Sequence, residues 1–257
     1  MPDGSPRTLR VTAPSPPPGG PTEFDLTVWL PDGGSGPGVL LIQEIFGVSD
    51  YIRAVAEDLA GLGYVVAAPD LFWRIKPGHQ AKHDEAGLKE SLELGGRFDA
   101  TQGVADATAA LRHLAALPEV DGGTGIIGFC LGGSIAYLVA AQAEIDAAAA
   151  DLGAVVSFYG SLVPDNTGAM GQISSPTQLH FGGSDPYIPR DQVARVEQAA
   201  AGHPQVEMHV EEDAGHAFHN RMAPMFHVAE PAGRAWRRTE EFLQRHLPTR
   251  EKDSSSS

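Results

Sequence analysis

Apolar residues follow two spacings along this chain, and the two spacings alternate. Short continuous apolar runs are typical of parallel strands buried on both faces, whereas an apolar residue at every third or fourth position is typical of a helix with one buried side. The runs predict strands at residues 39–42, 64–68, 125–129, 154–159, 177–181 and 206–210. The helical spacing predicts helices at residues 50–62, 99–117, 134–143, 189–201 and 230–246. This alternation predicts an α/β fold in which helices cover both faces of a mostly parallel, doubly wound sheet.

The two ends of the chain differ in composition from the region between them. Residues 14–20 are proline, serine and glycine only, a composition that cannot form a packed helix. They belong either to a flexible tail or to a long turn between two edge strands, at 9–11 and 24–30. We therefore divide the chain into a flexible Pro/Gly-rich segment at 1–21, one α/β domain at 22–247 and a disordered tail at 248–257.

The composition limits the classes of function. With 257 residues, of which 42% are hydrophobic, the chain can bury a full core. Its formal net charge of −15 disfavours binding to nucleic acid or to an anionic membrane. The single cysteine excludes an intramolecular disulfide. Because the sequence shows neither a signal peptide nor an apolar stretch of about 18 residues, we expect a cytoplasmic protein.

The candidate nucleophile, Cys130, lies where a buried strand meets a helix. The pattern Gly-x-Cys-x-Gly at 128–132 leaves almost no room for a loop, and glycine on both sides avoids a collision at a strained turn. The helix N-terminus that follows favours a thiolate. A lone cysteine is more often an inert buried residue. This pattern, however, is that of the nucleophile elbow of an α/β-hydrolase, with cysteine in place of serine.

Two further reactive side chains come directly after predicted strands. Asp185 follows the strand at 177–181, and His216 follows the strand at 206–210. Because the carboxyl ends of parallel strands meet at one edge of a sheet, these side chains can converge on the cysteine. The order nucleophile, acid, base is that of α/β-hydrolases, in which the carboxylate orients the imidazole base. The spacings leave no room for a cap domain, and residues 71–96 predict a polar helical excursion above the sheet.

Glu44 is an unusual residue for its position. It ends the buried strand at 39–42, where a carboxylate is desolvated unless it has a partner. The loop after this strand usually supplies an oxyanion donor, so the backbone N–H of Ile45 would join that of Leu131. Glu44 would then lie close to Cys130 and could exchange a proton with its thiol. The alternative is a solvated glutamate at a strand end.

A zinc site is the competing interpretation of the histidine-rich region near the C-terminus. The candidate ligands are His209, His216, His219 and His227. Two of them are three residues apart, but no helix clearly holds them and no cysteine joins them. We therefore expect no metal.

Five short segments together resemble the dienelactone hydrolase family. They are Gln-Glu-Ile-Phe-Gly-Val at 43–48, Ala-Pro-Asp-Leu-Phe at 68–72, Gly-Phe-Cys-Leu-Gly-Gly at 128–133, Gly-Gly-Ser-Asp at 182–185 and Ala-Gly-His-Ala-Phe at 214–218. The resemblance covers roughly residues 22–247 and implies a single-domain α/β-hydrolase that needs no cofactor. It also implies a triad of Cys130, Asp185 and His216, with Glu44 in contact with the cysteine, and a monomer or weak homodimer. The name-giving reaction opens the lactone ring of carboxymethylenebutenolide to give maleylacetate.

The substrate-binding positions depart from those of the name-giving enzymes. There, arginines hold the substrate carboxylate, but in this sequence the two arginine positions fall on Leu88 and Asn220. Arg74, Arg97 or Arg221 would have to supply the cation instead. A pocket without it would be more apolar. The candidate substrate-binding residues are Phe46, Leu88, Leu92, Tyr159, Phe218 and Arg221.

Taken together, the residues predict a cysteine-dependent hydrolase of small lactones or esters. The substrate would be a dienelactone or a related ester. The first alternative is a carboxylesterase or thioesterase that acts on a more apolar substrate. The second, from another class, is a non-catalytic ligand-binding protein on a hydrolase fold.

Overall fold

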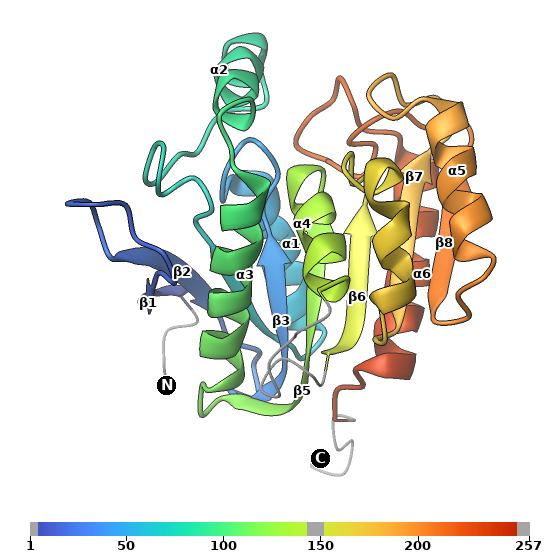
Figure 1. The fold of residues 1–257 in the computed structure, drawn as a ribbon. Coiled ribbons are helices and arrows are strands. Elements are labelled where there is room, and N and C mark those ends of the chain that lie inside the picture. Colours follow the sequence, from blue (N-terminus) through green and yellow to red (C-terminus); the bar gives the residue numbers. More distant parts are fainter. Residues whose placement is uncertain (1–4, 143–151, 251–257) are drawn as a thin grey trace.

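The apolar runs form the centre of one eight-stranded sheet in the computed structural model, which describes residues 5–142 and 152–250 (Figure 1). The strands are β1 (Arg7–Thr12), β2 (Glu23–Trp29), β3 (Gly36–Ile42), β4 (Val65–Pro69), β5 (Val120–Phe129), β6 (Leu152–Phe158), β7 (Thr177–Gly182) and β8 (Val206–Glu211). Their order across the sheet is β1-β2-β4-β3-β5-β6-β7-β8. β1 and β2 are antiparallel to their neighbours, and all other pairs are parallel. The expected mostly parallel sheet is therefore confirmed.

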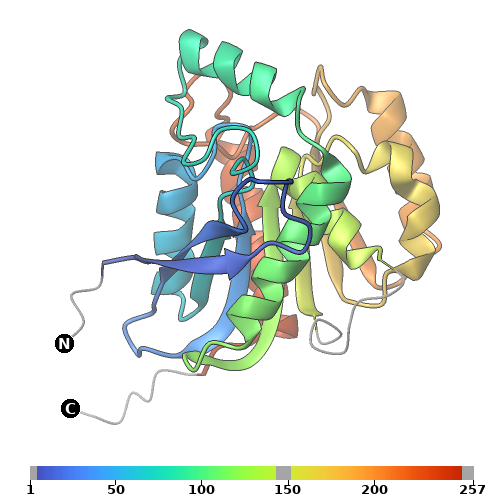
Figure 2. The same cartoon turned by 60° about the vertical axis from the view of Figure 1, so that its left-hand side comes forward.

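Helices cover both faces of this sheet, which makes it doubly wound as expected. They are α1 (Asp50–Gly61), α2 (Glu85–Gly95), α3 (Ala100–Ala115), α4 (Leu131–Ala140), α5 (Arg190–Ala200) and α6 (Ala229–His246), with a 3₁₀ segment η1 (Pro164–Gln172). In Figure 1, α3 and α4 lie in front of the sheet, whereas α1 and α6 lie behind it. Figure 2 shows α2 standing above the carboxyl ends of the central strands. None of the helices in the described ranges has the length and apolar character that crossing a bilayer requires.

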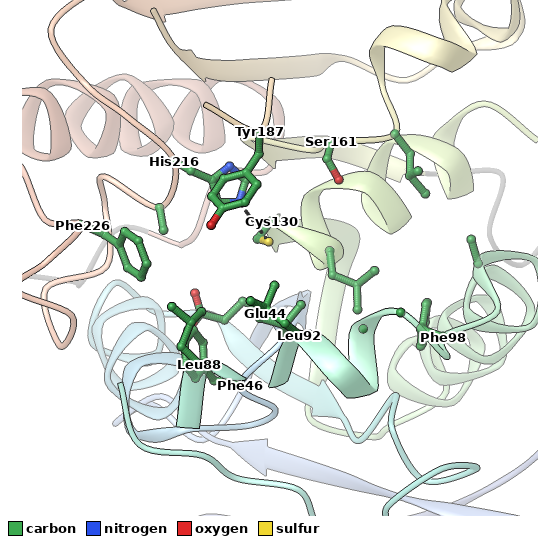
Figure 3. Close-up of a pocket in the computed structure, with 17 residues that line it drawn as sticks. Glu44, Phe46, Leu88, Leu92, Phe98, Cys130, Ser161, Tyr187, His216 and Phe226 are labelled. Carbon is green, nitrogen blue, oxygen red and sulfur yellow. Dashed lines mark hydrogen bonds between the residues drawn. The ribbon is translucent and has the colours of Figure 1, made fainter. Parts of the chain in front are cut away.

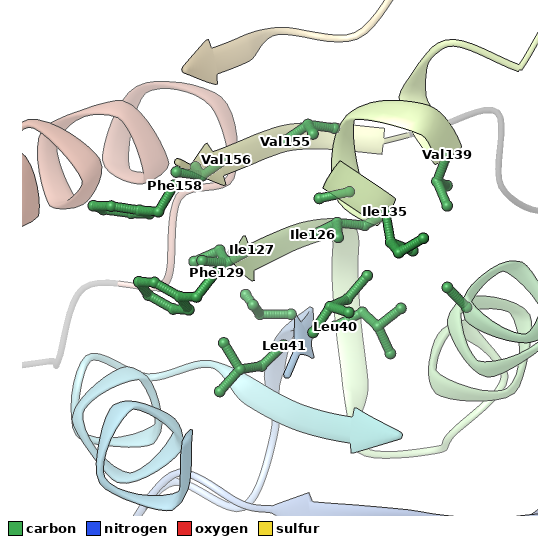
Figure 4. Packing of buried hydrophobic residues seen from close by; sticks show 14 of the residues in the cluster. Leu40, Leu41, Ile126, Ile127, Phe129, Ile135, Val139, Val155, Val156 and Phe158 are labelled. Atoms are coloured by element: carbon green, nitrogen blue, oxygen red, sulfur yellow. The ribbon is translucent and has the colours of Figure 1, made fainter. Parts of the chain in front are cut away.

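The core is built from the central strands and holds their ends in place. Leu40, Ile126 and Val155 lie next to one another across β3, β5 and β6, and all three are fully buried (Figure 4). Leu41 and Ile127 form the next row in the same register. Burying one such side chain contributes roughly 1.5–3 kcal/mol. Because the register is fixed here, the residues that follow each strand start from fixed positions.

The structure differs from the sequence-based expectations at several element ends. Residues 7–12 are an edge strand, so of the two interpretations of the N-terminal segment the structure has the turn between two strands, although the second strand, β2, lies inside the sheet between β1 and β4. The segment η1 was not predicted, because its sequence has no apolar periodicity. Most of the expected C-terminal tail, residues 251–257, lies outside the described residues.

Candidate active site

The turn at Cys130 is as tight as its glycines predict. Helix α4 begins at Leu131, three residues earlier than the apolar spacing indicates, so strand and helix are joined by the cysteine alone. Cys130 has φ 56° and ψ −115°, a strained backbone for a residue with a side chain. A Cβ on Gly128 would lie 2.0 Å from the carbonyl oxygen of Gly132, and one on Gly132 would lie 2.3 Å from that of Ile42. Only glycine fits at these two positions.

Cys130, His216 and Asp185 form one hydrogen-bonded row. His216 Nε2 lies 3.1 Å from Cys130 Sγ, and His216 Nδ1 lies 2.7 Å from Asp185 Oδ2. The other oxygen of Asp185 accepts the backbone N–H groups of Tyr187 at 2.8 Å and Ile188 at 3.2 Å. With Asp185 ionised, its carboxylate can only accept, so Nδ1 of His216 carries a proton. The three predicted residues therefore lie in the geometry of a nucleophile, a base and an orienting acid.

The electrostatics of His216 favour its charged form. Burial opposes the imidazolium, but the charge of Cys130 and the hydrogen bond that His216 donates to Asp185 outweigh it and raise the pKa of His216 to about 10. The rings of Tyr159 and Tyr187 lie with their centroids 5.1 Å from that of His216. The imidazole is thus held in place by packing as well as by hydrogen bonds.

Glu44 is buried and has side-chain partners, so it is not a solvated strand-end glutamate. Its carboxylate oxygen Oε1 lies 2.8 Å from His83 Nε2 and accepts Asn220 Nδ2–H at 2.9 Å. Only 2% of its side chain is exposed. Burial raises the pKa of the Tyr159 hydroxyl well above its ordinary value, and the charges of Glu44 and Cys130 raise it further. The Tyr159 hydroxyl therefore lies within electrostatic range of both Glu44 and Cys130.

A cavity of about 470 Å³ lies over Cys130 and is lined mainly by apolar side chains (Figure 3). Its wall consists of Glu44, Ile45, Phe46, Leu88, Leu92, Gly95, Gly96, Phe98, Ala100, Cys130, Leu131, Ser161, Leu162, Tyr187, His216, Ala217 and Phe226. The expected oxyanion donors Ile45 and Leu131 are among them, as are three of the candidate substrate-binding residues, Phe46, Leu88 and Leu92. The cavity wall therefore brings together Cys130, His216, Glu44 and both expected donor residues.

The other three candidate substrate-binding residues lie outside the cavity wall. Tyr159 and Phe218 are fully buried and pack against each other with ring centroids 5.4 Å apart. Arg221 is exposed and pairs with Asp58 of α1 at 2.6 Å. These three residues support the site or lie beside it, and contact with a bound substrate is not expected from their positions.

None of the three arginines considered as a carboxylate clamp reaches the cavity. Arg74 is bound to Asp106 by two hydrogen bonds of 2.8 and 2.9 Å. It shares with Arg97 a separate pocket of about 50 Å³, and Phe98 lines both pockets. No lysine or arginine occurs among the described residues that line the main cavity. The expectation of a more apolar pocket agrees with this arrangement.

Three of the four histidines considered as zinc ligands have other hydrogen-bond partners, namely His216, His219 and His227. Within residues 5–142 and 152–250, no group of three or more His, Cys, Asp or Glu side chains is arranged to hold a metal ion. His219 Nδ1 lies 2.7 Å from the hydroxyl of Tyr51, and burial lowers the pKa of His219 to about 3. His227 Nδ1 lies 3.1 Å from the backbone oxygen of Phe218. The zinc interpretation thus finds no site in this part of the chain.

Sequence reasoning missed several residues of the site. His83 is the most informative, because it contacts a residue 39 positions away and belongs to no motif. Ser161, Leu162 and Phe226 come from loops without apolar periodicity. Tyr187 follows Asp185 by two residues, a position that its place in the strand-end loop could have indicated.

Comparison with known proteins places the chain in a family. The sequence profile of the dienelactone hydrolase family matches residues 24–247. A carboxymethylenebutenolidase of Pseudomonas putida is 32% identical over 221 residues, 86% of this chain and 90% of that protein. One from another Pseudomonas strain is 33% identical over 226 residues, 88% of this chain and 91% of that protein. The crystal structure of a dienelactone hydrolase-like promiscuous phosphotriesterase from metagenomic libraries superposes with a TM-score of 0.76 at 26% identity, covering 95% of this chain and 98% of that one. The chain belongs to the dienelactone hydrolase family, has its α/β-hydrolase fold and is a carboxylic ester hydrolase.

Proposed function

We propose that this protein hydrolyses small uncharged lactones or esters through a covalent intermediate on Cys130. The observation that carries the proposal is the row of hydrogen bonds from Asp185 through His216 to Cys130 beneath an apolar cavity. The family supplies the reaction class, and this row supplies a nucleophile with a base at hydrogen-bonding distance.

Acylation begins with attack of the Cys130 thiolate on the carbonyl carbon of the substrate. The carbonyl oxygen becomes an oxyanion, which the N–H groups of Ile45 and Leu131 would hold. When the tetrahedral intermediate collapses, the C–O bond to the leaving group breaks. The imidazolium of His216 gives its Nε2 proton to the departing alkoxide, so that an alcohol leaves and a thioester remains on the cysteine.

Deacylation uses His216 in the reverse role. The now neutral imidazole takes a proton from a water molecule, whose oxygen attacks the thioester carbon. Collapse of this second intermediate breaks the C–S bond and restores the thiolate beside the imidazolium. Asp185 holds the ring in one tautomer throughout both steps. The carboxylic acid and the enzyme are the products.

The cavity favours substrates without a carboxylate. A carboxylate that leaves water needs a cation, and a bidentate arginine would supply hydrogen bonds worth about 1.5–3 kcal/mol. The described lining contains no such side chain and already contains Glu44. We therefore place uncharged acyl groups ahead of dienelactone itself, with esters and thioesters as the two leaving-group classes.

A substrate panel combined with one substitution tests this function. The panel contains p-nitrophenyl acetate and butyrate, one acyl thioester, and cis- and trans-dienelactone. We expect higher kcat/KM for the uncharged substrates than for the dienelactones. Cys130→Ala should lower kcat by at least about 10³-fold without unfolding the protein. Turnover retained by Cys130→Ala, or binding of these compounds without turnover by the wild type, would contradict the proposal.

A further inference from the structure

His83 forms a close contact with Glu44 that the reaction scheme does not yet use. The two side chains are 6% and 2% exposed, and their nearest atoms, Nε2 and Oε1, are 2.8 Å apart. With Glu44 ionised, its carboxylate only accepts hydrogen bonds, so the N–H at Nε2 of His83 donates to it. The ring of His83 also packs on Phe46 with centroids 4.4 Å apart. The imidazole is therefore a fixed donor to Glu44.

Asn220 supplies the second donor, and its orientation is settled by its other contact. Its Oδ1 accepts the backbone N–H of Met222 at 2.9 Å, which leaves Nδ2 to donate to Glu44 at 2.9 Å. Asn220 is fully buried and follows His216 by four residues. The loop that carries the catalytic histidine is thus joined to Glu44.

Both donors bind the same oxygen of Glu44. Within the described parts of the chain, no hydrogen bond reaches the other oxygen, Oε2, while Glu44 itself lines the cavity together with Cys130. With Oε1 held by two donors, the carboxylate is restricted to one orientation, and Oε2 is the oxygen left for the cavity. A carboxylate held in this way can meet the thiol or a bound substrate without first reorienting.

The backbone around His83 is anchored to the same loop as Glu44. Ala81 N–H donates to the carbonyl of Phe46 at 3.0 Å. Gly47 has φ 81°, and a Cβ there would lie 1.8 Å from the carbonyl oxygen of His79. Asp84, directly after His83, caps α2 by accepting Gly87 N–H at 2.8 Å. The backbone is therefore held in place on both sides of His83, which limits the positions that its imidazole can take.

We propose that His83 is a positioning residue that holds Glu44 in the orientation needed for acylation of Cys130. The inference rests on the proposed function, because it requires Cys130 to be the group that is acylated. His83 itself does not touch the cavity, so it acts through Glu44 and moves no proton to the substrate.

Two substitutions separate the effect of the hydrogen-bond donor of His83 from the effect of its ring. His83→Phe keeps a ring against Phe46 but removes the donor, whereas His83→Gln places an amide N–H near the position of Nε2. With p-nitrophenyl butyrate, whose kcat/KM reports acylation, we expect His83→Phe to lose roughly ten-fold or more. His83→Gln should recover most of that loss. If His83→Phe does not fold, His83→Met serves in its place, since it also fills the space without a donor.

Ser91→Ala is the matched control. Ser91 is fully buried in α2, and its Oγ lies 3.3 Å from Nε2 of His79 in the segment that carries His83, without contact to Glu44. Its substitution should change thermal stability but leave kcat/KM within about two-fold. A similar loss of rate in Ser91→Ala and His83→Phe would show a general effect of the segment and would overturn the proposal.

A double-mutant cycle with Glu44→Gln tests whether His83 acts through Glu44. If His83 acts through Glu44, His83→Phe adds no further loss in the Glu44→Gln background. Three results would each overturn the inference while Cys130→Ala remains inactive. They are additive losses of rate in the double mutant, equal losses in His83→Phe and His83→Gln, and a wild-type rate in His83→Phe. Activity in Cys130→Ala would overturn the proposed function, and the inference with it. The two failures are thus distinguishable.

Discussion

The floor and the opposite wall of the cavity are built in different ways. The floor consists of residues at the ends of β3, β5, β7 and β8, and backbone contacts fix them, as the close approach of Gly132 to Ile42 shows. The wall consists of α2 and the segment before it, which stand above the sheet and attach through side chains such as His83 and a few backbone bonds. In the proposed reaction the floor sets the chemistry, and the wall selects the substrate and orients Glu44.

A single methyl group added at the turn around Cys130 should destabilise the floor of the cavity. In Gly132→Ala the new Cβ would lie 2.3 Å from the oxygen of Ile42 and 2.6 Å from that of Gln43, both backbone atoms that cannot yield cheaply. We expect the free energy of unfolding to fall by about 3 kcal/mol or more. Chemical denaturation measures this loss.

Gly96→Ala is the corresponding change in the wall. There the nearest atoms to a new Cβ are 3.5 Å away, and Gly96 has φ −66°, which alanine adopts readily. The unfolding free energy should change by less than about 0.5 kcal/mol. Equal losses in the two variants would show that floor and wall are equally rigid, against the comparison drawn here.

A change of charge in the wall should alter the substrate and spare the chemistry. Leu88 lines the cavity from α2, and Leu88→Arg would place a guanidinium there. We expect kcat/KM for dienelactone to rise roughly ten-fold, because a charge-assisted hydrogen bond to its carboxylate contributes about 1.5–3 kcal/mol. The rate with p-nitrophenyl butyrate should fall.

Leu88→Met controls for the shape of the wall, because it alters packing without adding a charge. If Leu88→Arg and Leu88→Met change the rates for charged and uncharged substrates by the same factor, the absence of a cation is not what limits dienelactone turnover. That result would remove the charge argument for the substrate class.

The same contrast explains what could be predicted from sequence. The positions of Cys130, Asp185 and His216 follow from short apolar runs and their glycines, because a strand end needs only local sequence and a sheet register. The contact of His83 could not be predicted, since it depends on how residues 79–83 fold back onto the loop at 44–47. Arg221 is close to the right position in sequence, but Asp58 of α1 binds it on the surface. Side-chain contacts of this kind produce no periodic pattern in the sequence.

A charge pair between Cys130 and His216 is the starting state of the proposed acylation, and an NMR titration of the His216 imidazole tests it without a substrate. We expect His216 to keep its proton until the pH approaches its pKa of about 10, and to lose it at lower pH in Cys130→Ala, where the stabilising charge is missing. His219, whose pKa burial lowers to about 3, serves as an internal control that stays neutral over this range. A wild-type His216 that titrates near 6.5, unchanged in Cys130→Ala, would contradict the charge pair and the nucleophile proposed from it.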